Sequence, residues 1–380
     1  MKYSIIGAGI GGLTTALAFE KAGIEYQIFE KTQKMTPVGA GIWLAPNALQ
    51  VLEIFNVLDE IQKNGNSIDR ITLGKADLSP ISDTYQDTIK QLFGYSTIAI
   101  HRAELQKILY SKIPKEKIHL GKGFSHFEEL TNGKVKVFFD DNSAYETDVL
   151  IGADGINSKL RKQLFPKSKT RYSGQTCWRG VADIKIDKGF QNRGMELWGD
   201  QVRFGISRLS ENKVYWFAVA LAAPNQDDEV ETVQQKLSKM FSEFHPLVNK
   251  LILSTPPDDI IRNDIIDLEP LDKWYKNNIC LIGDAAHGAT PNLGQGGAQA
   301  IEDAYYLSEI IKLRPKENIF EIFQEKRIKK VNSIVKQSWV TGKMAHWKYG
   351  RGIRNFILKH MPNKLLEKKT IELYEIEKGL

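Results

Sequence analysis

The segment KYSIIGAGIGGLTTALAFEKAGIEYQIFE, residues 2–30, decides the fold of the N-terminal part of this 380-residue chain. A short apolar run, Tyr3–Ile6, leads directly into the glycine-rich GAGIGG. The stretch Leu13–Ala22 then has the length and composition of a helix that ends at Gly23. A second apolar run, Tyr26–Phe29, follows. The order strand, tight turn, helix and strand predicts the first unit of a Rossmann-like nucleotide-binding fold.

Three glycines and one acidic residue give this unit its binding chemistry. Gly7 permits the tight turn, Gly9 lets the backbone approach a pyrophosphate at the helix N-terminus, and Gly12 lets the helix pack closely on the strand. Glu30 ends the second strand, about 20 residues beyond the glycines, where a carboxylate accepts the hydroxyls of an adenosine ribose. The motif predicts a dinucleotide, but it does not separate FAD from NAD. A glycine-rich turn without a ligand is the alternative.

Composition indicates an ordinary globular protein. Hydrophobic residues make up 42% and charged residues 26% of the chain, which excludes disordered and fibrous classes. The longest apolar run, near residues 215–223, is shorter than the ~20 residues that cross a bilayer. The first strand begins almost at Met1 and leaves no room for a cleavable signal, so we expect a cytoplasmic protein.

Cysteine content and charge exclude two further classes. Cys177 and Cys280 are the only cysteines, too few for a disulfide framework or a metal cluster, and we expect both to be reduced and no metal site to exist. The net charge is +6, yet no basic helix with a nucleic-acid reading motif is visible. Nucleic acid is therefore not an expected partner.

Two later segments indicate whether the dinucleotide is FAD or NAD. DVLIGADGINSKLRKQL, residues 148–164, and ICLIGDAAHGATPNLGQGGAQAIEDA, residues 279–304, each begin with an apolar strand that runs into a Gly/Asp turn. With GAGIGG they resemble the three fingerprints of class A flavoprotein monooxygenases of the para-hydroxybenzoate hydroxylase fold. The resemblance covers nearly the whole chain and implies FAD as the cofactor.

The resemblance assigns roles that the physical chemistry of the residues supports. Asp284 ends a buried strand, where a carboxylate can accept a ribityl hydroxyl; a helix N-cap is the alternative. The loop at 294–297 offers backbone N–H groups to the negative charge of reduced flavin. Arg102 matches an arginine on the FAD phosphates, and a solvated helix arginine is the alternative. Asp154 matches a residue with a dual FAD and NAD(P)H role, or it only caps a turn. His287 is interpreted as structural.

The complete set of predicted cofactor-binding residues is Gly7, Gly9, Gly12, Glu30, Lys31, Gly41, Ile42, Arg102, Asp154, Asp284, Gly294, Gly296 and Gly297. Gly41 and Ile42 belong to a segment that resembles the one passing along the isoalloxazine ring.

A second pattern indicates the substrate domain. Short alternating strands between Gly180 and Ile266 predict an antiparallel sheet, and Asp227–Phe244 predicts a helix that covers one face. Ile71–Gly74 and Phe93–Thr97 are expected as further strands. The sheet is expected to form a roof over the flavin, with the substrate between them. The predicted domains are residues 1–70, 98–179 and 267–320 for FAD, residues 71–97 and 180–266 for the substrate, and residues 321–380 for C-terminal helices.

Three residues are predicted to be catalytic. Arg203 and Tyr215 lie on neighbouring strands, where alternating side chains point either to the cavity or to the covering helix; a packed aromatic core is the alternative. Pro291, in TPNLGQG, matches a proline that the family holds close to the reactive flavin carbon.

A closer resemblance narrows the substrate class. YSGQTCWRG, residues 172–180, and the C-terminal VKQSWVTGKMAHWKYGRGIRNFILKHMPN look like 2-alkyl-4-quinolone 3-hydroxylases, and more distantly like zeaxanthin epoxidases and salicylate or urate hydroxylases. This implies a planar, partly apolar aromatic substrate. The tail at 359–378 is predicted to be a helix docked on the protein's own surface, although a basic amphipathic helix permits peripheral membrane contact. We expect a monomer or a homodimer.

The implied reaction is hydroxylation. NADH or NADPH, bound transiently, reduces the flavin, dioxygen adds at flavin C4a, and the hydroperoxide transfers one oxygen atom to the ring. A flavin-dependent reductase of isoprenoid double bonds is one alternative, and a non-catalytic binding module on the same scaffold is another. The intact TPNLGQG loop and the WRG segment favour the monooxygenase.

Overall fold

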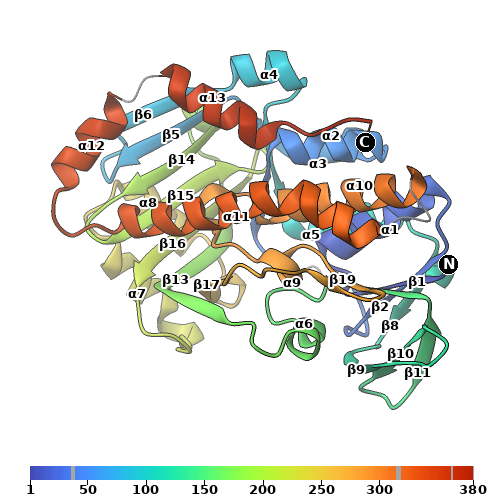
Figure 1. Cartoon of the computed structure of the whole chain (residues 1–380). Coiled ribbons are helices and arrows are strands. Elements are labelled where there is room, and N and C mark those ends of the chain that lie inside the picture. Colours follow the sequence, from blue (N-terminus) through green and yellow to red (C-terminus); the bar gives the residue numbers. More distant parts are fainter. Residues whose placement is uncertain (36–38, 314–317, 361–362, 380) are drawn as a thin grey trace.

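The computed structural model describes residues 1–35, 39–313, 318–360 and 363–379. Its nucleotide-binding part is built on a six-stranded sheet in the order β18-β19-β12-β1-β2-β8 (Figure 1). The central strands are apolar and buried, as expected for parallel strands covered on both faces. The strands are β18 (Tyr275–Lys276), β19 (Ile279–Leu281), β12 (Val149–Gly152), β1 (Tyr3–Ile6), β2 (Tyr26–Glu30) and β8 (Ile118–Leu120).

Helices cover one side of this sheet and a small sheet covers the other (Figure 1). Helix α1 ends at Gly23, whose φ of 67° is the left-handed cap conformation that glycine adopts freely. It packs beside α10 and α5. The elements of this part are α1 (Ile10–Ala22), α2 (Pro46–Ile54), α3 (Leu58–Asn64), α5 (Arg102–Ser111), α6 (Lys159–Leu164), α9 (Asp284–His287), α10 (Gly296–Leu313), β9 (Phe124–Glu129), β10 (Val135–Phe139) and β11 (Ala144–Thr147).

The second part is a seven-stranded sheet in the order β17-β13-β16-β15-β14-β5-β6. All neighbouring strands are antiparallel except β14 and β5, which are parallel. The strands are β17 (Ile261–Leu268), β13 (Thr170–Asp183), β16 (Lys213–Leu221), β15 (Val202–Arg208), β14 (Arg193–Trp198), β5 (Arg70–Lys75) and β6 (Pro80–Tyr85). Because β13 already joins this sheet at Thr170, the predicted domain boundary between residues 179 and 180 falls inside a strand.

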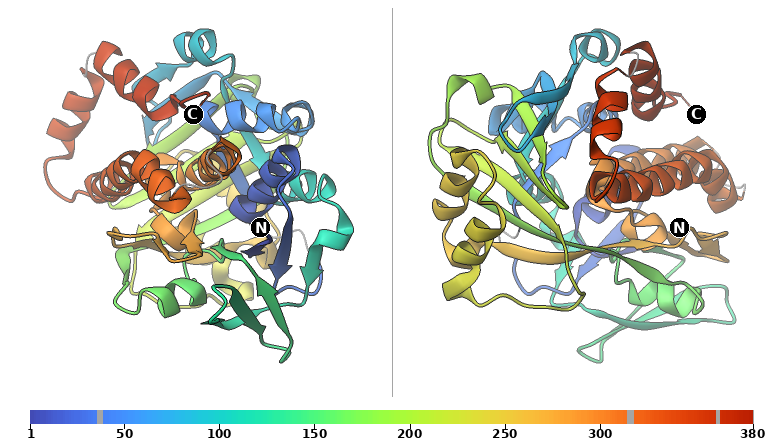
Figure 2. Two further views of the ribbon diagram at one scale, coloured as in Figure 1. Left: turned by 45° about the vertical axis from the view of Figure 1, so that its right-hand side comes forward. Right: turned by 90° about the vertical axis from the view of Figure 1, so that its left-hand side faces the viewer.

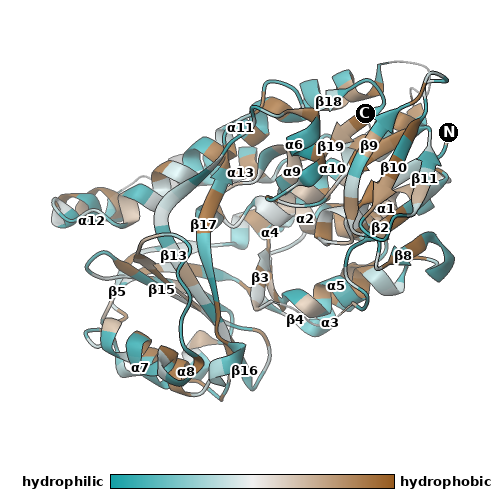
Figure 3. Cartoon of the chain, turned by 90° about the horizontal axis from the view of Figure 1, so that it is seen from below, coloured by the Kyte–Doolittle hydropathy of each residue, from teal (hydrophilic) through white to brown (hydrophobic). Residues whose placement is uncertain are grey.

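Helices α7 (Val230–Met240) and α8 (Pro246–Leu253) cover the outer face of the seven-stranded sheet. Their apolar sides meet an apolar core of that sheet (Figure 3). The other face looks toward α10 and the long helix α11 (Ile319–Ala345), as the edge-on view in Figure 2 shows. The helix predicted within Asp227–Phe244 is therefore confirmed.

One expected strand is wrong. Residues Phe93–Thr97 were assigned to the roof sheet, but α4 (Asp87–Phe93) ends there and Gly94, with a φ of 86°, caps it. Thr97 instead begins β7 (Thr97–His101), which pairs with β3 (Gly41–Leu44) and β4 (Gly65–Ile68) in a separate three-stranded sheet.

The chain ends in two short helices, α12 (Arg351–Lys359) and α13 (Asn363–Tyr374). Residues 361–362 of the predicted tail helix lie outside the described residues. The α/β class is confirmed, with a Rossmann-like part, an inserted and largely antiparallel sheet, and C-terminal helices.

Candidate active site

In the glycine turn, the space around Gly9 is open, whereas Gly12 is in close contact with the backbone. A Cβ atom at Gly12 would lie 1.9 Å from the carbonyl oxygen of Gly7, so α1 can approach β1 only through glycine. A Cβ atom at Gly9 would meet nothing within 4 Å. Helix α1 has no side-chain N-cap and no acidic residue in its first turn, so its free N–H groups and positive dipole end face this open space.

Glu30 is held by the same turn. Its carboxylate accepts hydrogen bonds from the backbone N–H groups of Ala8, at 2.8 Å, and Thr32, at 3.0 Å. These bonds leave further lone pairs on the carboxylate for a ligand hydroxyl. Lys31 is exposed beside it. The turn and the acidic strand end are thus fixed relative to each other before any ligand arrives.

The side chain of Asp284 is exposed to solvent but surrounded by protein. Asp284 follows Gly283, which has a φ of 55°, and it begins α9. Its side chain is exposed, yet desolvation by the surrounding protein raises the pKa of its carboxyl group. Both observations hold together if the carboxylate lines a cavity. A Cβ atom at Gly296, the first residue of α10, would lie 3.7 Å from Asp284 Oδ1, so this carboxylate lies beside the N-terminus of an 18-residue helix.

Arg102 lies close enough to Asp284 for the two charged groups to interact. It begins α5, and its backbone N–H donates to the carbonyl oxygen of Ala40 at 2.8 Å. Its side chain is exposed, while desolvation and the neighbouring Arg179 lower the pKa of its guanidinium group, against the opposing effect of Asp284. Arg102 therefore belongs to the lining of a cavity rather than to a solvated helix surface.

Strand β3 connects this space with the roof sheet. Ile42 Cδ1 lies 3.1 Å from the position of a Cβ atom at Gly297, so β3 lies across the start of α10. The ring of Tyr215 packs on Gly41, where a Cβ atom would lie 2.3 Å from it. Gly41 and Ile42 thus lie between the loop at 294–297 and the seven-stranded sheet.

Asp154 combines a capping contact with a free oxygen. Its Oδ2 accepts a hydrogen bond from the backbone N–H of Leu160 at 3.2 Å, which supports the start of α6. Its Oδ1 is buried and has no hydrogen-bond partner among the described residues. Desolvation raises the pKa of this carboxyl group. The orphaned oxygen is compatible with a ligand contact, and the cap is compatible with the structural alternative.

The two faces of the roof sheet separate the aromatic residues. Tyr215 and Phe217 share the inner face with Arg203, because these positions alternate with outer-facing ones along paired strands. Phe204 and Trp216 stack on the outer face with a centroid distance of 5.5 Å, under α7. Part of the predicted aromatic set is therefore core, and part faces the nucleotide-binding side.

Arg203 connects three elements and is almost completely buried. Its guanidinium group donates to Glu196 Oε1 at 3.0 Å on β14, to Gln175 Oε1 at 3.2 Å on β13, and to Asn292 Oδ1 at 2.7 Å. Asn292 lies between Pro291, which is exposed, and the glycine loop. Arg203 thus holds the loop that carries Pro291 against the roof sheet.

A buried polar network lies beneath the glycine loop, and sequence reasoning did not identify it. Arg327 of α11 forms ion pairs with Glu302 and, at 2.9 Å, with Asp303 of α10. Asp303 also accepts from the backbone N–H of Gly283 at 2.9 Å and lies 2.6 Å from His287 Nε2. The structural interpretation of His287 agrees with this contact.

The network extends to the flavin-side loop. Asn47 Nδ2 donates to Gln295 Oε1 at 3.0 Å and to Glu302 Oε1 at 2.6 Å. Gln295 follows Gly294 directly, so the network fixes both ends of the predicted cofactor segment, at Gly283 and at Gln295. The spacing of Glu302 and Asp303 along α10 was visible in the sequence, but the partner on α11 was not.

These features fit FAD. Two helix N-termini without acidic residues suit a pyrophosphate and an anionic ring, and Arg102 adds positive charge between them. Asp284 and Glu30 supply acceptors for hydroxyl groups. Gly9 and Gly294 leave room where a side chain would intrude.

Comparison with known proteins decides the family. The family model described as "FAD binding domain" matches residues 1–338. The chain belongs to this family. It is 33% identical over 375 residues to the aurachin C monooxygenase/isomerase of Stigmatella aurantiaca, with 96% of each chain covered. It is 31% identical over 372 residues to a 2-heptyl-3-hydroxy-4(1H)-quinolone synthase of Pseudomonas aeruginosa, covering 96% of this chain and 95% of the relative.

A solved structure has the same fold as this member of the FAD-binding family. Klebsiella pneumoniae HpxO, crystallised with FAD and uric acid, superposes with a TM-score of 0.90 at 25% identity, covering 98% of this chain and 96% of that one. The predictions of FAD as cofactor and of an FAD-dependent monooxygenase are confirmed. Among the described residues, no helix has the length and apolar character needed to span a bilayer.

Proposed function

We propose that this flavoprotein hydroxylates a planar, partly apolar heteroaromatic ring that carries an acceptor oxygen, of the 4-quinolone type, with dioxygen and NADH or NADPH. The Pseudomonas aeruginosa relative is named as the synthase of a hydroxylated 4-quinolone. Uric acid, the ligand of the Klebsiella structure, is also a planar heteroaromatic ring with carbonyl oxygens. Both names support a planar heteroaromatic substrate with carbonyl oxygens.

Arg179 carries the proposal. It lies on the inner face of the roof sheet, paired across β13 and β16 with Phe217. Its Nη2 donates to Asn263 Oδ1 at 2.6 Å, whereas its Nε is buried without a hydrogen-bond partner among the described residues. An unpaired buried donor costs stability unless a ligand satisfies it. An acceptor oxygen on the substrate would satisfy it.

The surroundings of Arg179 are apolar. Phe217 packs with the buried side chains of Cys177, Val219 and Ile265 on the same face of the sheet. Such a surface suits one face of an aromatic ring and an alkyl substituent, and it excludes water from the reacting atoms. A donor at one edge and an apolar floor together would orient the ring.

The cofactor residues keep their predicted roles as part of this proposal. Gly9 and the start of α1 would hold the pyrophosphate together with Arg102, and Asp284 would accept a ribityl hydroxyl. The N–H groups of Gly296 and Gly297 would stabilise negative charge on the flavin ring. When bound, FAD supplies dioxygen activation and oxygen transfer, with one oxygen atom entering the ring and the other leaving as water.

The three predicted catalytic residues differ in what they can do. Pro291 is exposed at the loop before α10, where a substrate can reach it. Burial raises the pKa of the Tyr215 hydroxyl, so Tyr215 would remain protonated and could act as a hydrogen-bond donor but not as a base. Arg203 donates to three protein partners, although its Nε also lacks a partner among the described residues. Because its side chain is almost completely buried, we propose that it positions the Pro291 loop without touching the substrate.

The test is NADH and NADPH oxidation by the yellow holoprotein with 2-heptyl-4-quinolone, salicylate, urate or kynurenine. We expect the quinolone to stimulate oxidation and to yield a product heavier by one oxygen atom. The variant Arg179→Leu should raise KM by about ten- to a hundredfold, the effect of a charged hydrogen bond. Arg208→Leu, on the opposite face of the sheet, is the control.

Other outcomes would separate the alternatives. A product heavier by two hydrogen atoms would favour the reductase, and a colourless protein that cannot be reconstituted with FAD would favour a binding module. Stimulation by urate or salicylate alone would refute the quinolone-type substrate. A cytoplasmic location and a monomeric or homodimeric state stay predictions.

A further inference from the structure

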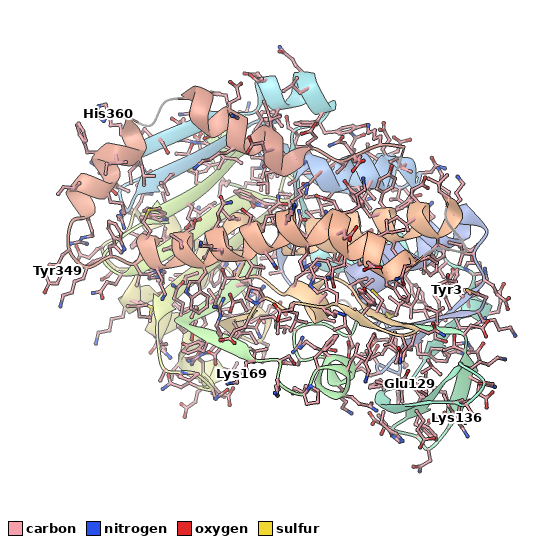
Figure 4. The ribbon with its side chains drawn as sticks, in the orientation of Figure 1. Tyr3, Glu129, Lys136, Lys169, Tyr349 and His360 are labelled. Carbon is pink, nitrogen blue, oxygen red and sulfur yellow. The ribbon has the colours of Figure 1, made fainter. Side chains whose placement is uncertain are left out.

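Helix α12 presents an apolar face that nothing in the described chain covers. Ile353, Phe356 and Ile357 are 70%, 64% and 55% exposed. Their spacing of three and four residues places them on one side of the helix. Trp347 and Tyr349, just before the helix, are also exposed. This apolar face, defined by these five residues, lies at the edge of the molecule, where Figure 4 marks Tyr349 and His360 at the two ends of α12.

The opposite side of α12 is firmly attached to the protein. Arg354 is buried, and its guanidinium group donates to the carbonyl oxygens of Met344 and Ala345 at 3.1 and 3.0 Å. The same group lies 4.5 Å from the ring centroid of Trp198 on β14. Arg351 forms an ion pair with Asp200 at 3.0 Å. The polar side therefore fixes the helix, and the exposure of its apolar face follows from that attachment.

Basic residues lie beside this face in the sequence. Residues 343–360 contain Lys343, Lys348, Arg351, Arg354 and Lys359 and no Asp or Glu. Arg354 is buried and Arg351 is paired with Asp200, so Lys343, Lys348 and Lys359 are the basic residues of this segment that form no ion pair within the described part of the chain. Lys348 and Lys359 flank the apolar face directly. Unpaired positive charge beside an exposed apolar face favours a negatively charged partner at this face.

We propose that α12 and the preceding Trp347–Tyr349 segment bind the surface of an anionic lipid bilayer. A helix with an apolar side, aromatic residues at its start and basic side chains beside it matches the chemistry of the interface between headgroups and acyl chains. The basic side chains bind anionic headgroups, and each contributes to affinity near the surface. A second copy of this chain is a poor occupant, because it would bring two positively charged surfaces together.

The surface differs from the tail helix for which membrane contact was considered from the sequence. In the tail, Tyr374 and Ile376 are buried against the protein, and Gln50 Nε2 donates to the carbonyl oxygen of Tyr374 at 3.0 Å. The tail beyond α13 thus docks on the chain itself, whereas α12 presents three exposed large apolar side chains on one side of a single helix. Membrane binding by α12 does not depend on the proposed substrate.

The test is co-sedimentation of the holoprotein with vesicles of phosphatidylcholine alone or mixed with phosphatidylglycerol. We expect binding to the anionic vesicles only, and weaker binding as salt increases. The double variant Ile353→Asp/Phe356→Asp should bind at least about tenfold more weakly, since burial of apolar side chains drives interfacial binding. Leu253→Asp, at an equally exposed apolar position on α8, is the matched control and should bind like the wild type.

Two further measurements keep the test independent of how the double variant folds. Lipids brominated in their acyl chains should quench tryptophan fluorescence in the wild type and not in Trp347→Phe. Lys348→Glu/Lys359→Glu should lose anionic binding without a change in flavin content. The proposal is overturned if the wild type ignores anionic vesicles at low salt. It is also overturned if the Asp variant binds equally well, or if the apolar face proves to form a dimer that this variant dissolves.

Discussion

Among the described residues, Arg327 is the only cation that contacts both buried acids of α10, and replacing it with Met removes both contacts. Arg327 is 1% exposed, and Glu302 and Asp303 are fully buried. Without the guanidinium group, Asp303 keeps only its contacts with His287 and Gly283, and Glu302 keeps Lys330 at 3.0 Å. Breaking a buried ion pair by removing one partner costs about 3–5 kcal/mol. The equilibrium constant for unfolding should therefore rise by roughly two to four orders of magnitude.

The neighbouring residue provides the control. Lys326, on the same helix, forms an ion pair with Glu377 of the C-terminal tail, but both side chains are well exposed. Lys326→Met should therefore cost less than about 1 kcal/mol. The assay is urea unfolding of each holoprotein at equal FAD saturation, followed by flavin release and by tryptophan emission. The reasoning is refuted if Arg327→Met and Lys326→Met unfold within about 1 kcal/mol of each other.

The same comparison has a pH dependence with a definite sign. Burial alone would raise the pKa of Asp303, but His287 and Arg327 lower it to about 2. Because the folded pKa lies below the unfolded value of 3.8, the stabilisation is complete above the unfolded value and is lost as pH falls toward 2. The difference between wild type and Arg327→Met should therefore shrink over this range. A difference that stays constant would show that the charge of Asp303 is not involved.

Three further outcomes follow from single positions. Gly12→Ala should impair both folding and FAD retention, because its Cβ atom would collide with Gly7. Gly9→Ala should leave the melting temperature of the FAD-free protein unchanged and weaken only FAD binding, which titration of flavin fluorescence can show. Burial and the nearby Arg203 lower the pKa of His346 from the ordinary value of 6.5 to about 4. The wild type should therefore lose stability as the pH falls from 6.5 toward 4, and His346→Gln should show a flatter dependence of melting temperature on pH. Tyr215→Phe should leave the pH dependence of kcat/KM between neutral pH and mild alkali unchanged, because the hydroxyl stays protonated there; a lost alkaline limb would contradict this.

The sequence predicted the parts of the fold that depend on local chemistry. The strand Tyr3–Ile6, the glycine turn and the cap at Gly23 each require particular residues at fixed spacing, and all three are present in the structure. The strand expected at Phe93–Thr97 failed for a related reason. That run contains Phe93, Tyr95 and Thr97, which are residue types common in strands, but Gly94 ends a helix there. The local pattern cannot distinguish a helix end followed by a strand from one continuous strand.

The inner and outer faces of the roof sheet could not be assigned from the sequence. Alternation shows that Arg203 and Phe204 point to opposite sides, but only packing shows which side carries α7. The roof-sheet arginine with the strongest signal for substrate contact, Arg179, was quoted only within a motif. Its Nε is unsatisfied, as are those of Arg203 and Arg262, but Arg203 is almost completely buried and Arg262 lies on the outer face beside Trp178. This combination depends on partners more than 80 residues away, such as Asn263.

The contacts that link α12 and Arg203 to β14 could not be predicted from the sequence, because they join residues that are far apart along the chain. Glu196 accepts hydrogen bonds from both Trp198 Nε1, at 2.8 Å, and Arg203, at 3.0 Å, and the far side of Trp198 supports Arg354 of α12. The helix proposed to bind lipid and the residue that holds the Pro291 loop thus pack on the same strand, β14. Each of these residues is unremarkable in its own segment, and only the antiparallel pairing of β14 with β15 brings them together.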